Sequence, residues 1–355
     1  MVYQGDQNYR NCGTLHKIRM DENMLKSFLG SIIQWSRDIL ESSEFGRGLL
    51  YEMVNKVSFN NIYAHEMMIA DTVRVNTYYD AIRRFVRQGD IVVDLGTGTG
   101  ILSFFSAQQN PKKIYAIDHS DMIDVARLIA EQNNISNITF IQTNSHEFSP
   151  IEKVDIILHE QMGQALLNEN MIENILDLKK RILKETGRIL PSKFELFLEP
   201  ICLKKEYKVP FIWENNLHGI NFEFLKNSDK IDKYKPRYYD NQSIEHDAIE
   251  YFLCEPEAVL SFDLDKMNDE NEIPQIIETT KKVIRSGSMD GICLYFRVIF
   301  DDEINFDTSP LHARTSWPNP LFRTENRHYE EGENISYKLT MEVPFKRETW
   351  ILTIN

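Results

Sequence analysis

Two glutamates, Glu160 and Glu169, stand nine positions apart in a segment that leaves an apolar run and passes through a glycine. A guanidinium group presents a rigid planar fork of N–H donors, which a carboxylate can accept in pairs. Two carboxylates converging on one point would therefore suit a planar cation of this kind. The alternative interpretation is a solvated acidic turn, and the choice between the two decides what the chain does.

A glycine-rich run indicates a second chemistry, the binding of an adenosine. Residues 94–100 read Asp-Leu-Gly-Thr-Gly-Thr-Gly between an expected strand and an expected helix, where glycines allow a tight turn close to a ligand. Asp118 ends the next expected strand, and a carboxylate there can accept both ribose hydroxyls. The dinucleotide pattern GxGxxG would need a glycine where Ile101 stands, which disfavours NAD.

A cofactor with an adenosine but no pyrophosphate fits this pattern, and S-adenosylmethionine is such a molecule. Its amino-acid tail carries a carboxylate that needs a cation. Arg74, in the helix expected before the first strand, is a candidate for that cation. A single helical arginine is more often a solvated surface residue, so this assignment depends on its surroundings.

Short apolar runs alternate with helical segments through the middle of the chain. Strands are expected at 91–95, 113–118, 138–141 and 154–158, and helices at 67–85, 100–107, 122–133 and 171–183. Alternation at this spacing indicates βαβ units and a doubly wound, Rossmann-like parallel sheet. Such sheets bind ligands beyond the carboxyl ends of their strands, where the glycine run, Asp118 and Glu160 all fall.

The pattern changes after Pro191. Short β-rich segments bounded by turns follow, which predict an all-β domain, either a barrel or a sandwich. Between 225 and 250 lies a polar insert with few aliphatic residues, either a loop or an arm that contacts another subunit. We therefore predict three parts: an N-terminal helical segment at 1–60, a cofactor-binding domain at 61–191 and a β domain for the substrate at 192–355.

Composition narrows the class of protein. The chain has 40 basic and 54 acidic side chains and a net charge of -14, which argues against general nucleic-acid binding and favours basic partners. Its four cysteines lie far apart, with no CxxC pair and no histidine spacing typical of a metal site. The N-terminus lacks the apolar core of a signal peptide, and no apolar run reaches the roughly 20 residues that span a bilayer. We expect a cytoplasmic protein with reduced thiols and with no metal, nucleic acid or membrane partner.

The order of these motifs resembles the protein arginine methyltransferase family. The resemblance is carried by HEMMIADTVRVNTY at 65–78, by the glycine run with the Ile-Leu-Ser that follows it, and by Met-Gly between the two glutamates. Trp-Glu-Asn at 213–215 and Thr-Ser-Trp at 315–317 extend it into the β half, so that it covers most of the chain. The double-glutamate loop is specific to that family, whereas the glycine run is shared by many methyltransferases.

The resemblance implies a class I methyltransferase fold followed by a β-barrel, S-adenosylmethionine as cofactor, and a homodimer held by an arm near 225–250. It implies that Glu160 and Glu169 grip the substrate guanidinium, that Arg74 holds the methionine carboxylate and that Asp118 holds the ribose. The implied cofactor-binding residues are His65, Arg74, Gly96, Thr97, Gly98, Asp118, Ser145 and Glu147, with His146 as the alternative to Glu147 at the adenine. The implied substrate-side residues are Met68, Met162, Ser316 and Trp317.

Three departures from the family pattern concern the acceptor. Most members have Trp after the first glutamate and Tyr three residues later, where this chain has Gln161 and Gln164. The usual Thr-His-Trp reads Thr-Ser-Trp, and two tyrosines of the helix before the cofactor site are missing from 55–61. Ser316 resembles the branch that makes symmetric dimethylarginine, whereas Met68 resembles the asymmetric branch, so the product type stays open.

The leading hypothesis is methyl transfer to an arginine guanidinium, with protein or peptide arginine narrowly favoured. Free L-arginine or a small guanidine metabolite is the close competitor, because a pocket with amides in place of aromatic walls suits a small molecule. His312, Arg314 and Arg323, which flank Trp317, would offer cations to its α-carboxylate. The alternative from another class is a non-catalytic methyltransferase-fold binding module, which the altered walls favour and the two retained glutamates oppose.

Overall fold

The computed structural model describes residues 61–232 and 242–355, so the predicted N-terminal helical segment at 1–60 lies outside the described residues. The first described helices are α3 (Ile62–Ala70) and α4 (Thr72–Phe85), where the sequence predicted one helix from Met67. The break falls at Asp71, whose backbone is extended. The carboxylate of Asp71 accepts a hydrogen bond from the backbone N–H of Arg74, so that Asp71 caps α4.

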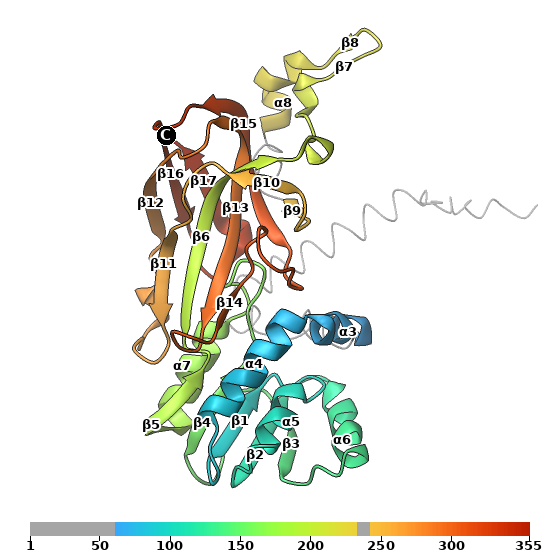
Figure 1. Ribbon diagram of the computed structural model, residues 1–355, viewed down its shortest axis with the longest axis vertical. Helices are drawn as coiled ribbons and strands as arrows, with labels where there is room; N and C mark the ends of the chain where they lie inside the picture. The colour runs from blue at the N-terminus through green and yellow to red at the C-terminus, as the bar shows by residue number, and fades with distance from the viewer. Residues whose placement is uncertain (1–60, 233–241) are drawn as a thin grey trace, which may run out of the picture. The chain divides into compact units, whose positions relative to one another are not determined.

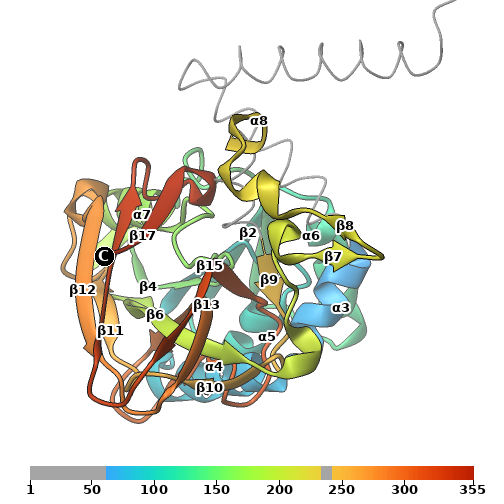
Figure 2. The same ribbon diagram turned by 90° about the horizontal axis from the view of Figure 1, so that it is seen from above.

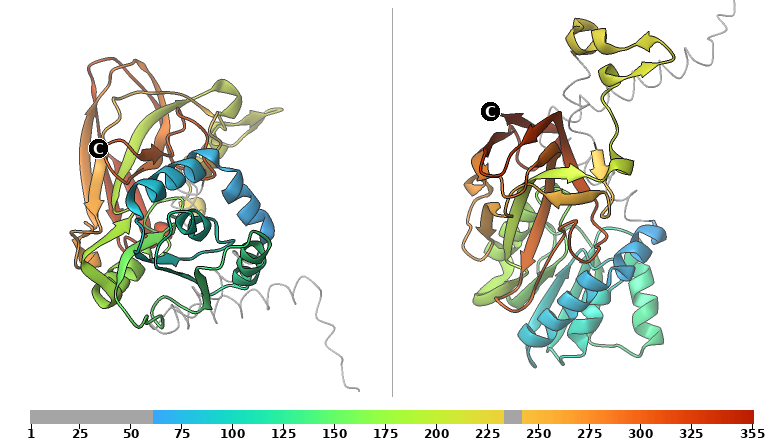
Figure 3. Two further views of the ribbon diagram at one scale, coloured as in Figure 1. Left: turned by 60° about the horizontal axis from the view of Figure 1, so that its bottom comes forward. Right: turned by 45° about the horizontal axis from the view of Figure 1, so that its top comes forward.

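A five-stranded parallel sheet carries the predicted alternation of strands and helices (Figure 1). Its strands pair in the order β3-β2-β1-β4-β5, with the bounds β1 (Ile91–Leu95), β2 (Lys113–Asp118), β3 (Ile138–Gln142), β4 (Val154–His159) and β5 (Leu183–Leu190). The connecting helices are α5 (Ile101–Ala107), α6 (Met122–Gln132) and α7 (Met171–Ile182). Because such crossovers are right-handed, α5 and α6 cover one face of the sheet and α7 the other. Helix α4 packs against α5, as the blue and teal helices of Figure 3 show.

The register of this sheet brings the predicted site together. All of β1 is buried, as expected for a central parallel strand, and β1 pairs with β2 on one side and β4 on the other. Leu95 is level with Ile117 of β2 and with His159 of β4. The glycine turn, Asp118 and Glu160 therefore begin directly beyond three paired residues, at the point where the strand order reverses and ligands bind in such sheets.

The C-terminal half is all-β, as predicted, and forms two antiparallel sheets (Figure 2). The larger one has seven strands: β6 (Lys193–Leu203), β9 (Gln242–Ile244), β10 (Ile249–Phe252), β11 (Ala258–Asp263), β13 (Gly287–Ile299), β14 (Asn305–Asp307) and β15 (Asn319–Tyr329). The smaller one has three strands: β12 (Ile276–Lys282), β16 (Asn334–Met341) and β17 (Trp350–Ile354).

Side chains join the two sheets. The hydroxyl of Tyr337 in β16 donates to the carbonyl of Leu198 in β6 at 2.5 Å, and the ammonium of Lys281 in β12 donates to the buried carboxylate of Glu199 in β6. Because these links are made by side chains, backbone pairing among residues 61–232 and 242–355 does not close the strands into the barrel that the sequence led us to expect.

A small hairpin precedes the polar insert. Strands β7 (Asn216–Leu217) and β8 (Ile220–Asn221) pair with each other through His218 and Gly219, whose positive φ angles suit a two-residue hairpin turn. The short helices η3 (Glu223–Asn227) and α8 (Asp229–Asp232) follow, and residues 233–241 lie outside the described part. Leu217 and Ile220 of the hairpin and Phe224 of η3 are exposed.

No helix within the described residues is both long enough and apolar enough to span a membrane.

Candidate active site

The glycine turn is built for close approach. Gly96, Gly98 and Gly100 have φ angles of 72°, 51° and 90°, in the left-handed region that favours glycine. A Cβ on Gly98 would lie 2.9 Å from the ring of His65, which is buried on α3, so His65 packs directly on the turn. Among residues 61–232 and 242–355, the side chain that a Cβ on Gly96 would approach is that of Gln161, at 4.0 Å. The turn is therefore closed on one side by His65 and more open above Gly96.

Two carboxylates hold this turn. Asp94 is buried, and its Oδ2 accepts hydrogen bonds from the hydroxyls of Thr97 and Ser103, each at 2.7 Å. Burial raises the pKa of Asp94, and its Oδ1 has no partner among the described residues. Asp118 accepts the backbone N–H of Gly98 at 2.8 Å and that of Ser120 at 2.7 Å. Each oxygen of Asp118 keeps a lone pair that could accept a ribose hydroxyl.

Arg74 reaches from α4 into the double-glutamate loop. Its Nη2 lies 2.6 Å from Oε2 of Glu160, and its Cζ lies 5.2 Å from the ring centroid of Trp317. The side chains of Arg74 and Glu160 are 12% and 13% exposed, so the pair is largely removed from water. One guanidinium is thus already held between a carboxylate and an aromatic face.

Both glutamates of the loop have raised pKa values. Burial raises the pKa of Glu160 to about 7; the charge of Arg74 opposes this shift, and the charges of Glu169 and Asp71 add to it. Burial likewise raises the pKa of Glu169 to about 7, again opposed by Arg74. Two like charges in a site of low polarity need a cation, and an arriving guanidinium would favour their ionised forms.

Long-range hydrogen bonds fix the loop in place. The indole N–H of Trp317 donates to the carbonyl of Met162 at 2.7 Å, and the buried hydroxyl of Tyr78 donates to the carbonyl of His159 at 2.9 Å. The second carboxylate oxygen of Asp71 accepts the backbone N–H of Ser316 at 2.7 Å. Asp71 thus ties the start of α4 to the β half, next to Trp317.

The sequence reasoning missed Asp71, Tyr78 and His159. A capping signal was present for Asp71, which directly precedes a helical run. Nothing local marks the other two. Tyr78 meets the loop across 81 residues of chain, and the Nε2–H of His159 donates to the carbonyl of Pro191 at 2.8 Å. Burial lowers the pKa of His159 to about 4, so its ring is neutral at neutral pH.

Within the described part of the chain, the predicted site residues Met68, Ser145 and Glu147 have no hydrogen bond or ion pair with the cluster of Arg74, Glu160 and Trp317. Met68 lies half-buried on α3, and the Ser145 hydroxyl contacts the side-chain oxygens of Asn144 at 3.3 Å and Asn174 at 3.5 Å. Glu147 is exposed, and the ring of the neighbouring His146 lies 3.4 Å from Asp177. The adenine contact that we placed at Glu147 therefore stays a prediction.

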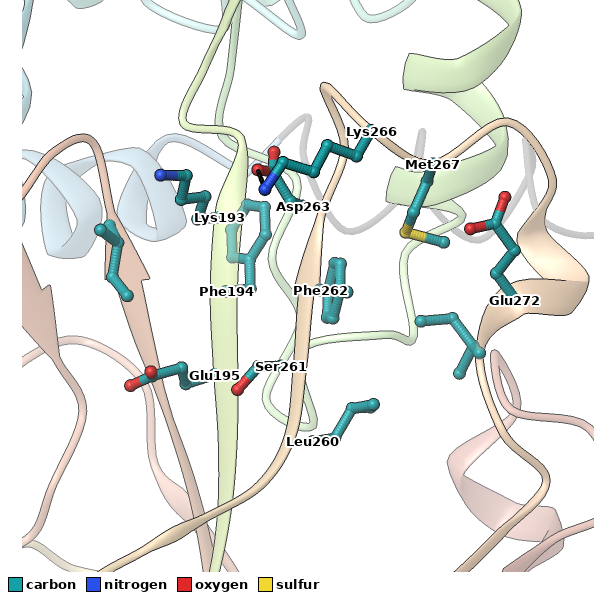
Figure 4. Close-up of a pocket in the computed structure, with 12 residues that line it drawn as sticks. Lys193, Phe194, Glu195, Leu260, Ser261, Phe262, Asp263, Lys266, Met267 and Glu272 are labelled. Atoms are coloured by element: carbon teal, nitrogen blue, oxygen red, sulfur yellow. Dashed lines mark ion pairs between the residues drawn. The ribbon is translucent and has the colours of Figure 1, made fainter.

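A separate cleft of about 460 Å³ lies in the β half (Figure 4). Phe194 and Phe262 stack in it with ring centroids 5.2 Å apart, and Lys266 faces Asp263. The residues that line it come from 193–195, 260–273 and 299, so it contains none of the predicted site residues. Phe194 also contacts the ring of His159, with centroids 6.1 Å apart, at the end of the strand that precedes the double-glutamate loop.

The residues of the crevice fit S-adenosylmethionine. Within the described part of the chain, no side chain crowds the backbone at Gly96, so a ligand can approach it there. Asp118 can accept hydroxyls, and Arg74 supplies a cation. A parallel sheet with this turn after its first strand and an acidic residue at the end of its second is typical of Rossmann-like enzymes that bind an adenosine. Ile101 in place of the third glycine of GxGxxG favours the class I methyltransferases over dinucleotide enzymes.

Comparisons with known proteins identify the family. A profile described as a methyltransferase domain matches residues 87–242, and one described as an arginine methyltransferase oligomerization subdomain matches residues 192–349. Protein arginine N-methyltransferase 6 of Danio rerio is 31% identical over 269 residues, which are 73% of this chain and 76% of that protein. A probable protein arginine N-methyltransferase 6.1 of Oryza sativa subsp. indica is 33% identical over 283 residues, 77% of this chain and 71% of that protein. The chain belongs to the protein arginine N-methyltransferase family of S-adenosylmethionine-dependent enzymes.

Solved structures agree with this assignment. The PRMT1 enzyme-prozyme heterotetrameric complex of Trypanosoma brucei with AdoHcy is 25% identical, with a TM-score of 0.69 over 80% of this chain and 89% of that one. Protein arginine methyltransferase 10 of Arabidopsis thaliana, in an open conformation, is also 25% identical, with a TM-score of 0.67 over 80% and 89% of the two chains. The predicted family is confirmed, and so is the predicted Rossmann-like methyltransferase domain followed by an antiparallel β domain.

Proposed function

We propose that this chain transfers a methyl group from S-adenosylmethionine to a guanidinium nitrogen of arginine in a protein or peptide. The observation that carries the proposal is the contact of Arg74 with Glu160 and Trp317. This contact supports the proposal because Glu160 offers the negative charge, and Trp317 beside the loop the aromatic face, that a guanidinium requires. The substrate arginine would be held by the same kind of contact, with Glu169 as the second carboxylate.

When bound, S-adenosylmethionine supplies an electrophilic methyl group on a positively charged sulfur. A protonated guanidinium is a poor nucleophile because its nitrogen lone pairs are delocalised. Glu160 and Glu169 would concentrate the positive charge on the nitrogens that they bind and orient the remaining nitrogen. A carboxylate whose pKa is about 7 can also accept the proton that this nitrogen must lose.

The surroundings of Trp317 support a protein or peptide substrate over free arginine. Free arginine would need a cation for its α-carboxylate, and the three candidates are engaged elsewhere. The ring of His312 lies 2.8 Å from Asp307, Arg314 lies 3.3 Å from Glu245, and Arg323 donates to the carbonyl of Val209 and lies over Phe211. A peptide arginine has no free α-carboxylate and does not need them.

The substrate class is tested by incubating the chain with methyl-labelled S-adenosylmethionine and either L-arginine or an Arg-Gly peptide. We expect label on the peptide at a rate well above that on free arginine, measured by mass spectrometry. Faster labelling of L-arginine would overturn the assignment of a peptide substrate, while arginine methylation itself would still be supported. Cofactor binding without label on either acceptor would favour the non-catalytic binding module.

The pH dependence of kcat/KM is a second test. A carboxyl group must be ionised to bind a guanidinium, and both glutamates have a pKa near 7 because they are buried. We expect kcat/KM to rise with pH below 7 and to level off above it, by about tenfold per pH unit if one glutamate must ionise and up to about a hundredfold if both must. The guanidinium stays protonated throughout this range. A kcat/KM that is constant between pH 5 and 8 would contradict the raised pKa values.

We also propose that the chain forms a homodimer through the insert. The match to an oligomerization subdomain supports this, and so do the apolar side chains of the hairpin and η3. Leu217, Ile220 and Phe224 are 56%, 65% and 70% exposed, although large apolar side chains are stabilised by burial. These residues begin before 225, so the proposed arm starts earlier in the chain than the sequence indicated.

A further inference from the structure

Gln161 directly follows Glu160, the first glutamate of the loop, yet its side chain lies beside the glycine turn. Its Cγ and Nε2 are 4.0 Å from the position that a Cβ on Gly96 would take. Its Oε1 is buried, and no hydrogen-bond donor among the described residues reaches it. A buried amide oxygen without a donor is costly, so this atom is expected to meet a donor when the site is occupied.

The position of Gln161 selects which donor that is. S-adenosylmethionine offers N–H and O–H donors at three places: the adenine amine, the ribose hydroxyls and the α-ammonium group of its amino-acid tail. Asp118, the proposed ribose partner, accepts from Gly98, two residues beyond Gly96, and from Ser120, which follows β2. The predicted adenine partners, Ser145 and Glu147, follow β3, two strands away from β1. The substrate guanidinium belongs to the other side of the loop, where Glu160 and Trp317 lie. The donor that remains beside Gly96 is the ammonium group.

We infer that Gln161 binds the α-ammonium group of S-adenosylmethionine through its Oε1, an inference that rests on the proposed function. Arg74 would bind the carboxylate of the same amino-acid tail, so the two residues would each bind one of its two charged groups. The ammonium has three N–H donors, and the unpaired Oδ1 of Asp94 can accept another of them without competing.

The chemistry of the side chain explains why an amide suits this position. Most members of the family have tryptophan at this position. Its indole has only an N–H donor and cannot accept a hydrogen bond from an ammonium. A carboxylate would accept but would place a third negative charge next to Glu160 and Glu169, whose pKa values are already raised. Glutamine supplies an acceptor without a charge.

The test compares two ligands in a binding experiment. S-adenosylhomocysteine keeps the amino group, and its desamino analogue has hydrogen in that place. Calorimetry with the full-length wild type should give much tighter binding of S-adenosylhomocysteine. In Gln161→Met, which keeps the length of the side chain and removes the amide, we expect S-adenosylhomocysteine to bind about tenfold or more weakly and the desamino analogue to bind unchanged.

Two variants serve as controls. Gln164→Met changes the exposed glutamine of the same loop, whose Oε1 accepts from Ser243 at 3.4 Å, and should leave both dissociation constants unchanged. Gln161→Glu restores an acceptor and should restore the preference for S-adenosylhomocysteine, which also keeps the inference testable if the Met variant folds poorly.

The outcomes are distinct. Equal weakening of the binding of both ligands in Gln161→Met would mean that the residue only shapes the glycine turn. Unchanged binding of both ligands with a raised KM for the peptide would place Gln161 at the substrate. Either result overturns the inference. A wild type that binds neither ligand would overturn the proposed function as well. The inference is supported if the wild type binds S-adenosylhomocysteine more tightly than the desamino analogue and Gln161→Met loses this preference.

Discussion

The variant Glu160→Gln is expected to lower kcat by at least about 10³-fold, because catalysis here depends on preorganised charge. The substitution keeps the shape of the side chain and removes its charge, and it turns a donor NH₂ toward the N–H groups of the substrate. Cofactor binding should stay nearly intact, since Arg74 keeps its charge and loses only a competing partner at 2.6 Å. Labelled methyl incorporation into an Arg-Gly peptide measures the first effect, and calorimetry with S-adenosylhomocysteine measures the second.

A matched control is available in Glu173→Gln. Glu173 is exposed in the first turn of α7, shortly after the loop, and its neutralisation should leave kcat unchanged. If Glu160→Gln keeps near wild-type turnover, the substrate guanidinium does not bind at this loop, and the proposed function is contradicted. Loss of turnover together with loss of cofactor binding would instead point to a collapsed crevice.

The variant Arg74→Met is expected to weaken S-adenosylhomocysteine binding by about 10- to 100-fold, the effect of losing charge-assisted hydrogen bonds to a carboxylate. A methionine fills much of the same space against Trp317 but offers no donor. The pKa of Glu160 should also rise, because the charge of Arg74 is the largest influence that lowers it. Arg74→Lys should recover only part of the affinity, since an ammonium lacks the planar fork of donors.

The control for this experiment lies on the same helix. Arg83 is exposed near the end of α4, with its guanidinium 5.4 Å from the ring centroid of Tyr79. Arg83→Met should therefore leave the dissociation constant of S-adenosylhomocysteine unchanged. Unchanged binding in Arg74→Met would show that Arg74 is only a structural partner of Glu160, and another cation would then have to hold the carboxylate.

Much of the parallel sheet was predictable from local patterns. Each buried strand is a short β-branched or apolar run, and the glycine turn follows the first of them directly, as in β1 and the turn at Gly96. The helix from 67 to 85 was wrongly joined, because the apolar spacing continues across Asp71 while its carboxylate caps a new helix there. In the β half the strands were predicted, but backbone pairing among the described residues does not close them into the expected barrel. The two sheets are joined by side-chain links such as Tyr337 to Leu198, which depend on which side chains face each other and cannot be predicted from local patterns.

The site divides in the same way. The sequence by itself determined its chemical components: two carboxylates in one loop, a glycine turn, an acidic strand end and an arginine before the first strand. The tertiary structure decided how they meet. The register of β1 with β2 and β4 sets the turn beside Asp118 and Glu160, and Trp317 reaches Met162 across 155 residues of chain. Only that packing turns Arg74 toward Glu160 and Gln161 toward Gly96, because side-chain contacts between distant segments leave no periodic trace in the sequence.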